Sequence, residues 1–310
     1  SEPAPEDIDP GHVPVSDPPP GRLVRMTGIV TVGGAEARPG MDLEPEVPIV
    51  VPPEGRAVIQ LRDEGRVELD GPARAILVED TSAQMLLIRG SLFAVQPPGA
   101  SSPRPPLRIG SPSATVEIGV AGELYLAAFE NGSGWLSVLG GGVAVTVGDA
   151  DNRHRLRTLE LTAGAAVTAT DRLAEPTQGP RRLSAAREAA AALAAATSFE
   201  LDSAVEQAAL GTDTTRLDQA LRFLETEARR GRELTNQHRD FVQEGNADEA
   251  TRVQRELVGH SQELYRLRRL ATARWERVRC KQLRLVMLNG ASREDPVALR
   301  ADRVAGLLGH

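Results

Sequence analysis

The sequence predicts two parts, an all-β sandwich or solenoid-like domain followed by an α-helical domain that contains a coiled-coil-like hairpin. Between residues 22 and 170, short runs of Val, Ile and Leu alternate with turn residues, which is typical of strands. After residue 183 the apolar residues recur at the spacing of helices. A length of 310 residues also fits about two domains.

The composition limits the function classes that fit. Hydrophobic residues make up 41% of the chain but aromatic residues only 3%, so Val, Leu, Ile and Ala must build the core. Few aromatic side chains are then left to line a small-molecule pocket. The net charge of −7 excludes a generally basic nucleic-acid binder. Cys280 is the one cysteine, which excludes an internal disulfide, and we expect it to be a packed helical side chain.

Residues 1–21 are rich in proline and acidic residues and contain no Lys or Arg before residue 22. Proline removes backbone donors and like charges repel, so this segment is predicted to be a disordered tether. No apolar run approaches the ~18 residues of a membrane span. Membrane association would therefore need an anchor upstream of Ser1, as in a lipoprotein.

The predicted β domain, residues 22–170, consists of short strands separated by Gly, Pro and Asp. The turn at residues 63–65 is expected to use Gly65 for a positive φ. The predicted strands span residues 23–32, 56–62, 66–70, 74–79, 84–96, 107–109, 114–120, 123–129, 134–139, 142–147, 155–161 and 166–170.

Several segments of this domain carry short motifs that differ from one another but follow in a recognisable order. They are Gly28-Ile29-Val30-Thr31-Val32, residues 55–69, residues 87–95, Arg108-Ile109-Gly110-Ser111-Pro112 with its continuation to residue 118, and residues 137–145. In order and spacing they resemble the FecR domain, the extracytoplasmic β module of bacterial iron-signalling regulators, over about residues 22–147. The resemblance implies a β fold outside the cytoplasm that binds and transmits rather than catalyses.

The second part, residues 184–310, follows a predicted linker at 171–183. Ser184 is a candidate N-cap for an Ala-rich helix that would continue to Leu210 and end at Gly211. This helix could serve as a third helix for the hairpin that follows.

Two heptad stripes predict that hairpin at about residues 214–288, with a turn at Gly245-Asn246. We expect the seam histidines, His238 and His260, to be packed or hydrogen-bonded rather than metal ligands, and we predict no metal or cofactor. The stripes are Leu217, Leu221, Leu224, Ala228, Gly231, Thr235, His238 and Val242, then Ala250, Val253, Leu257, His260, Leu264, Leu267 and Ala271.

The end of the second stripe is basic and supplies the candidate partner-binding residues. An acidic protein partner or anionic lipid head groups would suit this charge, whereas an exported protein rarely meets nucleic acid. A solvated helix face with arginine stems on apolar surface is the alternative. The candidates are Arg266, Arg269, Arg274, Arg277, Lys281 and Arg284.

No residue constellation predicts an enzyme. Asp149-Ala150-Asp151-Asn152 lacks the glycine and terminal glutamate of a calcium loop and fits a hairpin turn better. Gly140-Gly141-Gly142 precedes a strand rather than a phosphate-binding helix.

The sequence therefore predicts a non-enzymatic binding or scaffold protein in the periplasm or at the outer membrane. Its helices would recruit an envelope protein or make a homo-oligomer. The alternative is a FecR-like regulator that relays an outer-membrane signal to an inner-membrane partner. A cytoplasmic adaptor for nucleic acid or lipid is the third hypothesis.

Overall fold

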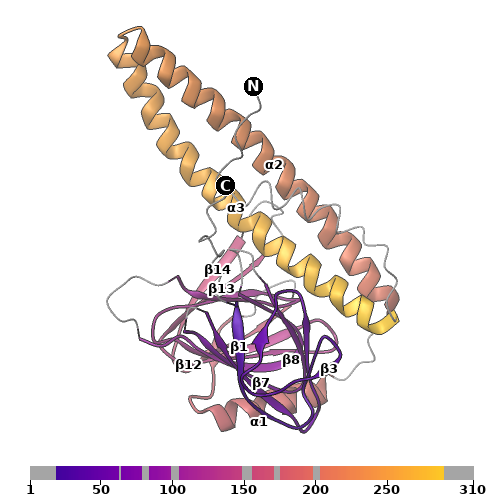
Figure 1. The fold of residues 1–310 in the computed structure, drawn as a ribbon. Helices are drawn as coiled ribbons and strands as arrows, with labels where there is room; N and C mark the ends of the chain where they lie inside the picture. The colour runs from indigo at the N-terminus through magenta and orange to yellow at the C-terminus, as the bar shows by residue number, and fades with distance from the viewer. Residues whose placement is uncertain are drawn as a thin grey trace, which may run out of the picture.

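The computed structural model describes residues 19–62, 64–78, 84–98, 105–148, 156–170, 175–197 and 203–289. Within them a strand-rich part precedes three helices, which confirms the predicted order of β then α (Figure 1). Residues 1–18 of the predicted tether, residues 171–174 of the predicted linker and the 149–152 turn lie outside the described residues. The strands are β1 (Gly21–Thr27), β2 (Thr31–Val32), β3 (Ala35–Glu36), β4 (Asp42–Leu43), β5 (Pro48–Val51), β6 (Arg56–Leu61), β7 (Arg66–Leu77), β8 (Met85–Val95), β9 (Leu107–Gly110), β10 (Thr115–Ile118), β11 (Glu123–Ala128), β12 (Gly134–Gly140), β13 (Gly142–Gly148), β14 (Leu156–Thr162), β15 (Ala165–Ala169) and β16 (Thr177–Gln178).

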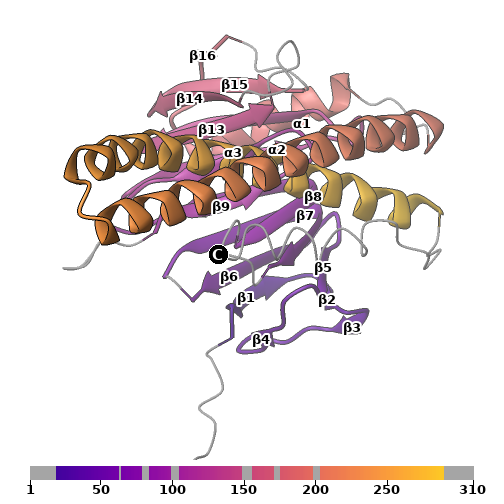
Figure 2. The same cartoon turned by 90° about the horizontal axis from the view of Figure 1, so that it is seen from above.

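The sheet branches at β8. One edge of β8 pairs with β7, while the other edge pairs with β9 near Met85 and with β11 from Gly90 to Val95. The β9 branch continues through β10, β13 and β14, and the β11 branch through β12, β15 and β16. Inward side chains of both branches, such as Val116 and Leu136, belong to one apolar core. Figure 2 shows β14–β16 at one end of the β domain and β1–β4 at the other.

β7 is one strand where the sequence predicted two. The predicted break falls at a register shift between Asp70 and Arg74, and pairing with β8 resumes beyond it. A bulge of this kind bends a strand without ending it. The turn before β7 also differs from the prediction, because Glu64 rather than Gly65 has the positive φ. A Cβ at Gly65 would lie 3.1 Å from the Gln96 side chain, so close packing explains this glycine.

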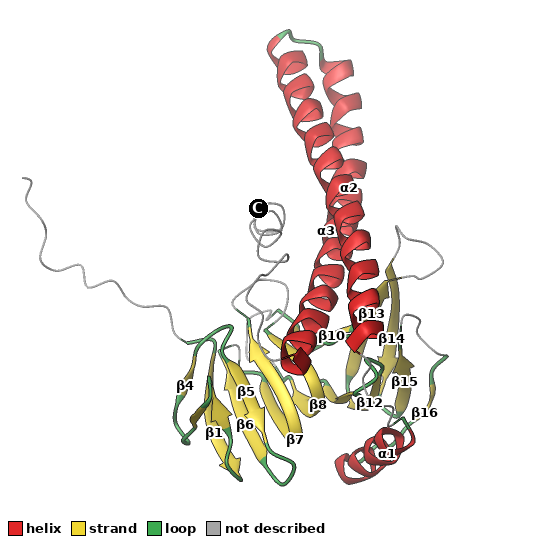
Figure 3. Ribbon diagram, turned by 90° about the vertical axis from the view of Figure 1, so that its right-hand side faces the viewer, coloured by secondary structure: helices red, strands yellow, loops and turns green. Residues whose placement is uncertain are grey.

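Helix α1 (Leu183–Ala196) belongs with the sheet and not with the other helices. It begins one residue before the predicted cap Ser184, ends well before Leu210, and makes no side-chain cap hydrogen bond. Its small Ala186 and Ala190 fit against the bulky rings of Tyr125 and Trp135. Figure 3 places α1 on the face of the β domain opposite α2 and α3, so the third-helix expectation is wrong.

Helices α2 (Ser203–Gln243) and α3 (Ala247–Asn289) lie side by side, joined by a turn in which Gly245 has a φ of 73°. The predicted C-cap Gly211 lies inside α2. Leu217, Leu221 and Leu224 pack against α3 as the heptads predict. Nearer the turn, Leu234 is buried while Val242 is 58% exposed. A helix with 3.6 residues per turn drifts away from a 3.5-residue stripe, which explains the change of seam.

Gly90 offers a test of the branch point. It has a φ of 91°, and a Cβ there would lie 2.6 Å from the Ala73 Cα, whereas Gly40 has a φ of 86° and open space. The backbone penalty of a Gly-to-Ala change, ~1 kcal/mol, applies to both, and the collision adds ~1–3 kcal/mol at Gly90. We expect Gly90→Ala to lower the free energy of unfolding clearly more than Gly40→Ala in urea titrations. Equal losses would contradict the packing of β7 against β8.

Candidate binding surfaces

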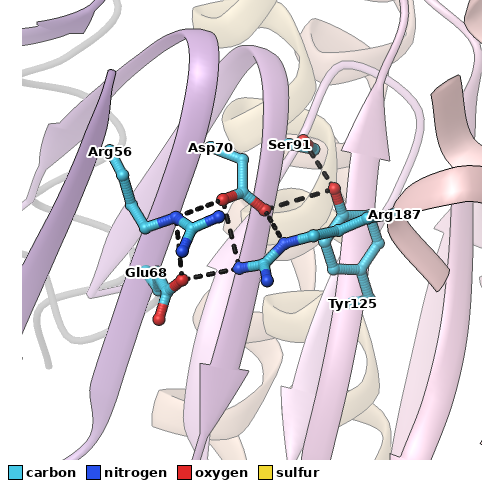
Figure 4. Close-up of polar contacts among 6 residues, drawn as sticks. All are labelled: Arg56, Glu68, Asp70, Ser91, Tyr125 and Arg187. Carbon is cyan, nitrogen blue, oxygen red and sulfur yellow. Dashed lines mark hydrogen bonds and ion pairs between the residues drawn. The ribbon is translucent and has the colours of Figure 1, made fainter. Parts of the chain in front are cut away.

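An ion-pair cluster fastens α1 to the sheet (Figure 4). The Arg187 guanidinium donates from Nε to Asp70 Oδ2 at 2.7 Å and from Nη2 to Asp70 Oδ1 at 3.1 Å and Glu68 Oε1 at 2.5 Å. Arg56 Nε lies 2.9 Å from Asp70 Oδ1 and 3.1 Å from Glu68 Oε1. Two guanidinium groups thus balance two carboxylates that come from neighbouring positions of β7.

Tyr125 completes the cluster from β11. Its hydroxyl donates to Ser91 Oγ at 2.8 Å and lies 3.4 Å from Asp70 Oδ2. Burial raises the pKa of Tyr125 to about 12, so its phenol stays protonated at neutral pH. Burial disfavours the Arg187 charge, but Asp70 and Glu68 outweigh burial and raise the pKa of Arg187. The cluster is therefore a fixed attachment at neutral pH.

Beside this cluster a groove of about 970 Å³ opens between α1 and the sheet. Ala190, Ala191 and Ala194 form its helical wall, and Phe129 lines it from the end of β11. Small alanine side chains leave the space open. Of the charged groups that line it, Arg56, Asp70 and Arg187 hold one another, Glu130 pairs with Arg89, and Glu54 is exposed. The apolar wall therefore suits binding of an apolar segment better than proton transfer.

Four of the six candidate basic residues are buried between elements of the chain. Arg284 Nε lies 3.0 Å from Glu206 Oε1, and its Nη1 donates to the Phe129 carbonyl at 3.0 Å. Lys281 Nζ lies 2.6 Å from Asp213 Oδ2, and Arg277 Nη2 lies 3.5 Å from the same oxygen. These residues attach α3 to α2 and to the end of β11.

The fourth buried residue is Arg274. Its burial, together with the positive charges of Arg216 and Arg277, lowers its pKa to about 10. Arg269 reaches Glu117 of β10 at 3.2 Å, and Arg266 pairs with Glu263 at 2.6 Å. Of the six candidates, Arg266 and Arg269 therefore have partly exposed side chains. A partner contact by Arg266 or Arg269 stays a prediction.

One line of residues on α3 faces the sheet. Cys280 packs against Ile76 and Ile88, Glu276 accepts a hydrogen bond from Thr115, and Arg269 follows with its pair to Glu117. At 3.6 residues per turn these three positions fall within about 40° of one line. The same line continues beyond the sheet to Tyr265 and Val258, which are 65% and 59% exposed.

We call residues 225–266 the arm, because this half of the α2–α3 pair projects beyond the β domain (Figures 1 and 3). Each of its helices is about 30 Å long at 1.5 Å per residue. His260 lies in its seam, with Nδ1 3.2 Å from Glu227 Oε2 and a side chain 6% exposed. Gly231 makes room for this ring, since a Cβ there would lie 2.5 Å from Nε2.

The described residues contain no group of three His, Cys, Asp or Glu residues placed to hold a metal ion. None of the helices in the described ranges has both the length and the apolar character to cross a membrane.

Comparisons with known proteins show a partial likeness. No protein-family profile matches the chain, and no curated protein matches its sequence. Two crystal structures of a putative anti-sigma factor from Parabacteroides distasonis are similar to 43% of the chain, with TM-scores of 0.35 and 0.34 and identities of 14% and 15%. The match spans 60% of the length of those structures. Likeness at this level carries no conclusion about what this chain binds.

The Asp213 cluster predicts an acid-sensitive attachment of α2. Burial raises the pKa of Asp213, but Arg277, Lys281 and Arg216 outweigh it, so the folded pKa lies below the ordinary value. The stability from this pair is therefore present above about pH 4, near the unfolded pKa, and is lost as the pH falls through the folded pKa. We expect Asp213→Asn to cost ~3 kcal/mol at pH 7, and a smaller amount at pH 3, in urea unfolding.

The exposed pair Arg22–Asp42, 2.6 Å apart, supplies the control. Asp42→Asn should change stability little at any pH, because solvent screens exposed pairs. A pH-independent loss in Asp213→Asn would contradict the ion-pair account.

Cys280 is expected to be unreactive in the folded chain. It is fully buried, and burial raises its pKa to about 12, so little thiolate exists at pH 8. A thiol-specific chromogenic reagent should label less than a tenth of the protein at pH 8 before unfolding and all of it in denaturant. Fast labelling of the native chain would mean that α3 leaves the sheet.

Proposed function

We propose that this chain is a non-enzymatic binding protein of the bacterial envelope, in which the β domain holds the arm in position for a protein partner. The observation that carries the proposal is the division of α3. Its C-terminal half is fixed to the sheet through Cys280, Glu276 and Arg269, while its N-terminal half projects with α2 into solvent. The FecR-like motifs of residues 22–147 support the extracytoplasmic location.

The attachment of α2 supports the same proposal. Asp213 and Glu206 of α2 lie in buried pairs with Lys281 and Arg284 of α3. A shift of α2 by one helical turn would separate these buried charges, and an unpaired buried charge costs several kcal/mol. The base of the arm is therefore held in one register, and a partner would meet a preorganised surface rather than a segment that must first order.

A signal-relaying regulator is the second candidate function. The observation that favours it is the contact of Arg284 with the carbonyls of Phe129 and Glu130, two residues that also line the groove beside α1. A segment bound in the groove would thus touch the same loop that anchors α3. Binding at the groove and at the arm would then be coupled.

Shortening the arm tests the first candidate. Deleting residues 225–238 and 252–265 removes two heptads from each helix and keeps the seam in register. The anchored ends of α2 and α3 keep their pairs, so the thermal midpoint of the β domain should change little. In its source cells the full chain should give a discrete adduct from a photoreactive residue at position 262. Because the shortened chain lacks that position, both chains are compared by co-purification through an affinity tag, and we expect the shortened chain to lose the complex.

A photoreactive residue at position 160, exposed on β14, is the matched control. It should give no discrete adduct. A complex that survives the deletion, or equal adducts from both positions, would remove the arm as the binding element. Binding of the same partner to the shortened chain through position 160 would favour the β domain instead.

A further inference from the structure

The face of α3 that contacts the sheet continues beyond it, and none of the described residues covers it there. At 3.6 residues per turn, Tyr265 and Val258 stand on the line that passes through Arg269, Glu276 and Cys280. We call this part the uncovered stripe. Its members are all exposed and are Thr251, Gln254, Val258, Ser261, Gln262 and Tyr265. The chain thus carries a helix-packing face along all of α3 but uses only half of it.

Two arginines flank the middle of the uncovered stripe. Arg255 on one flank is exposed, and Arg268 on the other has a buried Nε with no hydrogen-bond partner among the described residues. Glu256 lies 3.0 Å from Arg230 of α2, and Glu263 pairs with Arg266. The exposed Asp248 lies one turn before Thr251, at the end of the stripe nearest the hairpin turn. Around Val258 the stripe is thus flanked by two guanidinium groups, which favours an acidic partner.

The stripe also has the shape that a helix needs. Ser261 is small, so a second backbone can approach α3 closely beside it. Tyr265 supplies a rigid aromatic side chain, one of the residue types on which binding free energy concentrates. Val258 lies two helical turns away, at the spacing of successive anchors on an amphipathic helix.

From this geometry we infer that the uncovered stripe binds an acidic amphipathic helix of another protein. The inference rests on the proposed function and names the partner class for the arm. The apolar residues of the partner would pack on Tyr265 and Val258, and its carboxylates would pair with Arg255 and Arg268.

A designed peptide probes this inference directly. The probe is a labelled 21-residue helix with Leu at heptad positions a and d and Glu at e and g, and the comparison peptide carries Lys in place of Glu. Fluorescence anisotropy with the full chain should show binding of the acidic peptide, weaker at high salt, and at least ten-fold weaker binding of the basic one. Equal binding of both peptides would overturn the inference.

Substitutions then locate the contact. Tyr265→Ser should weaken binding of the acidic peptide by at least ten-fold, since anchors of this kind dominate binding. Arg255→Glu and Arg268→Glu should weaken it and reduce its salt dependence. Val242→Ser is the matched control. The Val242 side chain is 58% exposed, close to the 65% of Tyr265, but it lies on α2 away from the stripe. Unchanged binding by Tyr265→Ser, or equal loss in Val242→Ser, would overturn the assignment.

Two other occupants would also overturn the inference. If sedimentation shows a dimer of the full chain that Tyr265→Ser dissociates, the stripe binds a second copy. If a chain ending at residue 289 binds the peptide at least ten-fold more tightly than the full chain, residues 290–310 compete for the stripe. The proposed function is tested separately: loss of the cellular complex on arm deletion, with no peptide binding, would leave the arm as the binding element and reject only the acidic-helix partner.

Discussion

The helical part of this chain depends on how α3 meets the sheet. Glu276 is 3% exposed and lies between Thr115 and Arg108, with Arg108 Nη2 3.7 Å from its Oε1. A buried carboxylate without these neighbours would cost several kcal/mol. One turn of α3 is therefore fixed above β9 and β10, Cys280 falls into the apolar pocket of β7 and β8, and α2 follows through Asp213.

Buried and half-buried arginine side chains join the helices to the β domain in this chain, whose core is poor in aromatic residues. Arg284 reaches Glu206 in α2 and two backbone carbonyls after β11, so one side chain connects three elements. The planar guanidinium presents several donors in fixed directions, which an apolar side chain cannot do. The same solution recurs at α1, where Arg187 links the helix to two carboxylates of β7. Charge pairs thus determine where each helix sits, and alanine and leucine fill the space.

Local pattern predicts the elements well and their partners poorly. The strands at 84–96, 123–129 and 134–139 match β8, β11 and β12 within two residues, because alternation and flanking glycines act locally. The buried role of Lys281 was not predictable, since Asp213 lies 68 residues away on another helix. The Ala-rich segment was assigned to the wrong neighbours for a similar reason: helix propensity carries no information about Tyr125 and Trp135. Among the candidate site residues, the place of Arg269 on the helix was predictable from the sequence, but its contact with Glu117 of β10 was not.

The unbroken course of α3 has a mechanical consequence. α3 is one helix of 43 residues. A small rotation where it contacts the sheet therefore becomes a large displacement at its far end. With the arm about 30 Å long, a tilt of roughly 10° would move the turn at Gly245 by about 5 Å. Cys280 and Glu276 are too tightly packed against the sheet to absorb such a tilt. A force applied at the turn near Gly245 would therefore act first on the ion pair of Arg269 and Glu117, which lies where the arm meets the sheet.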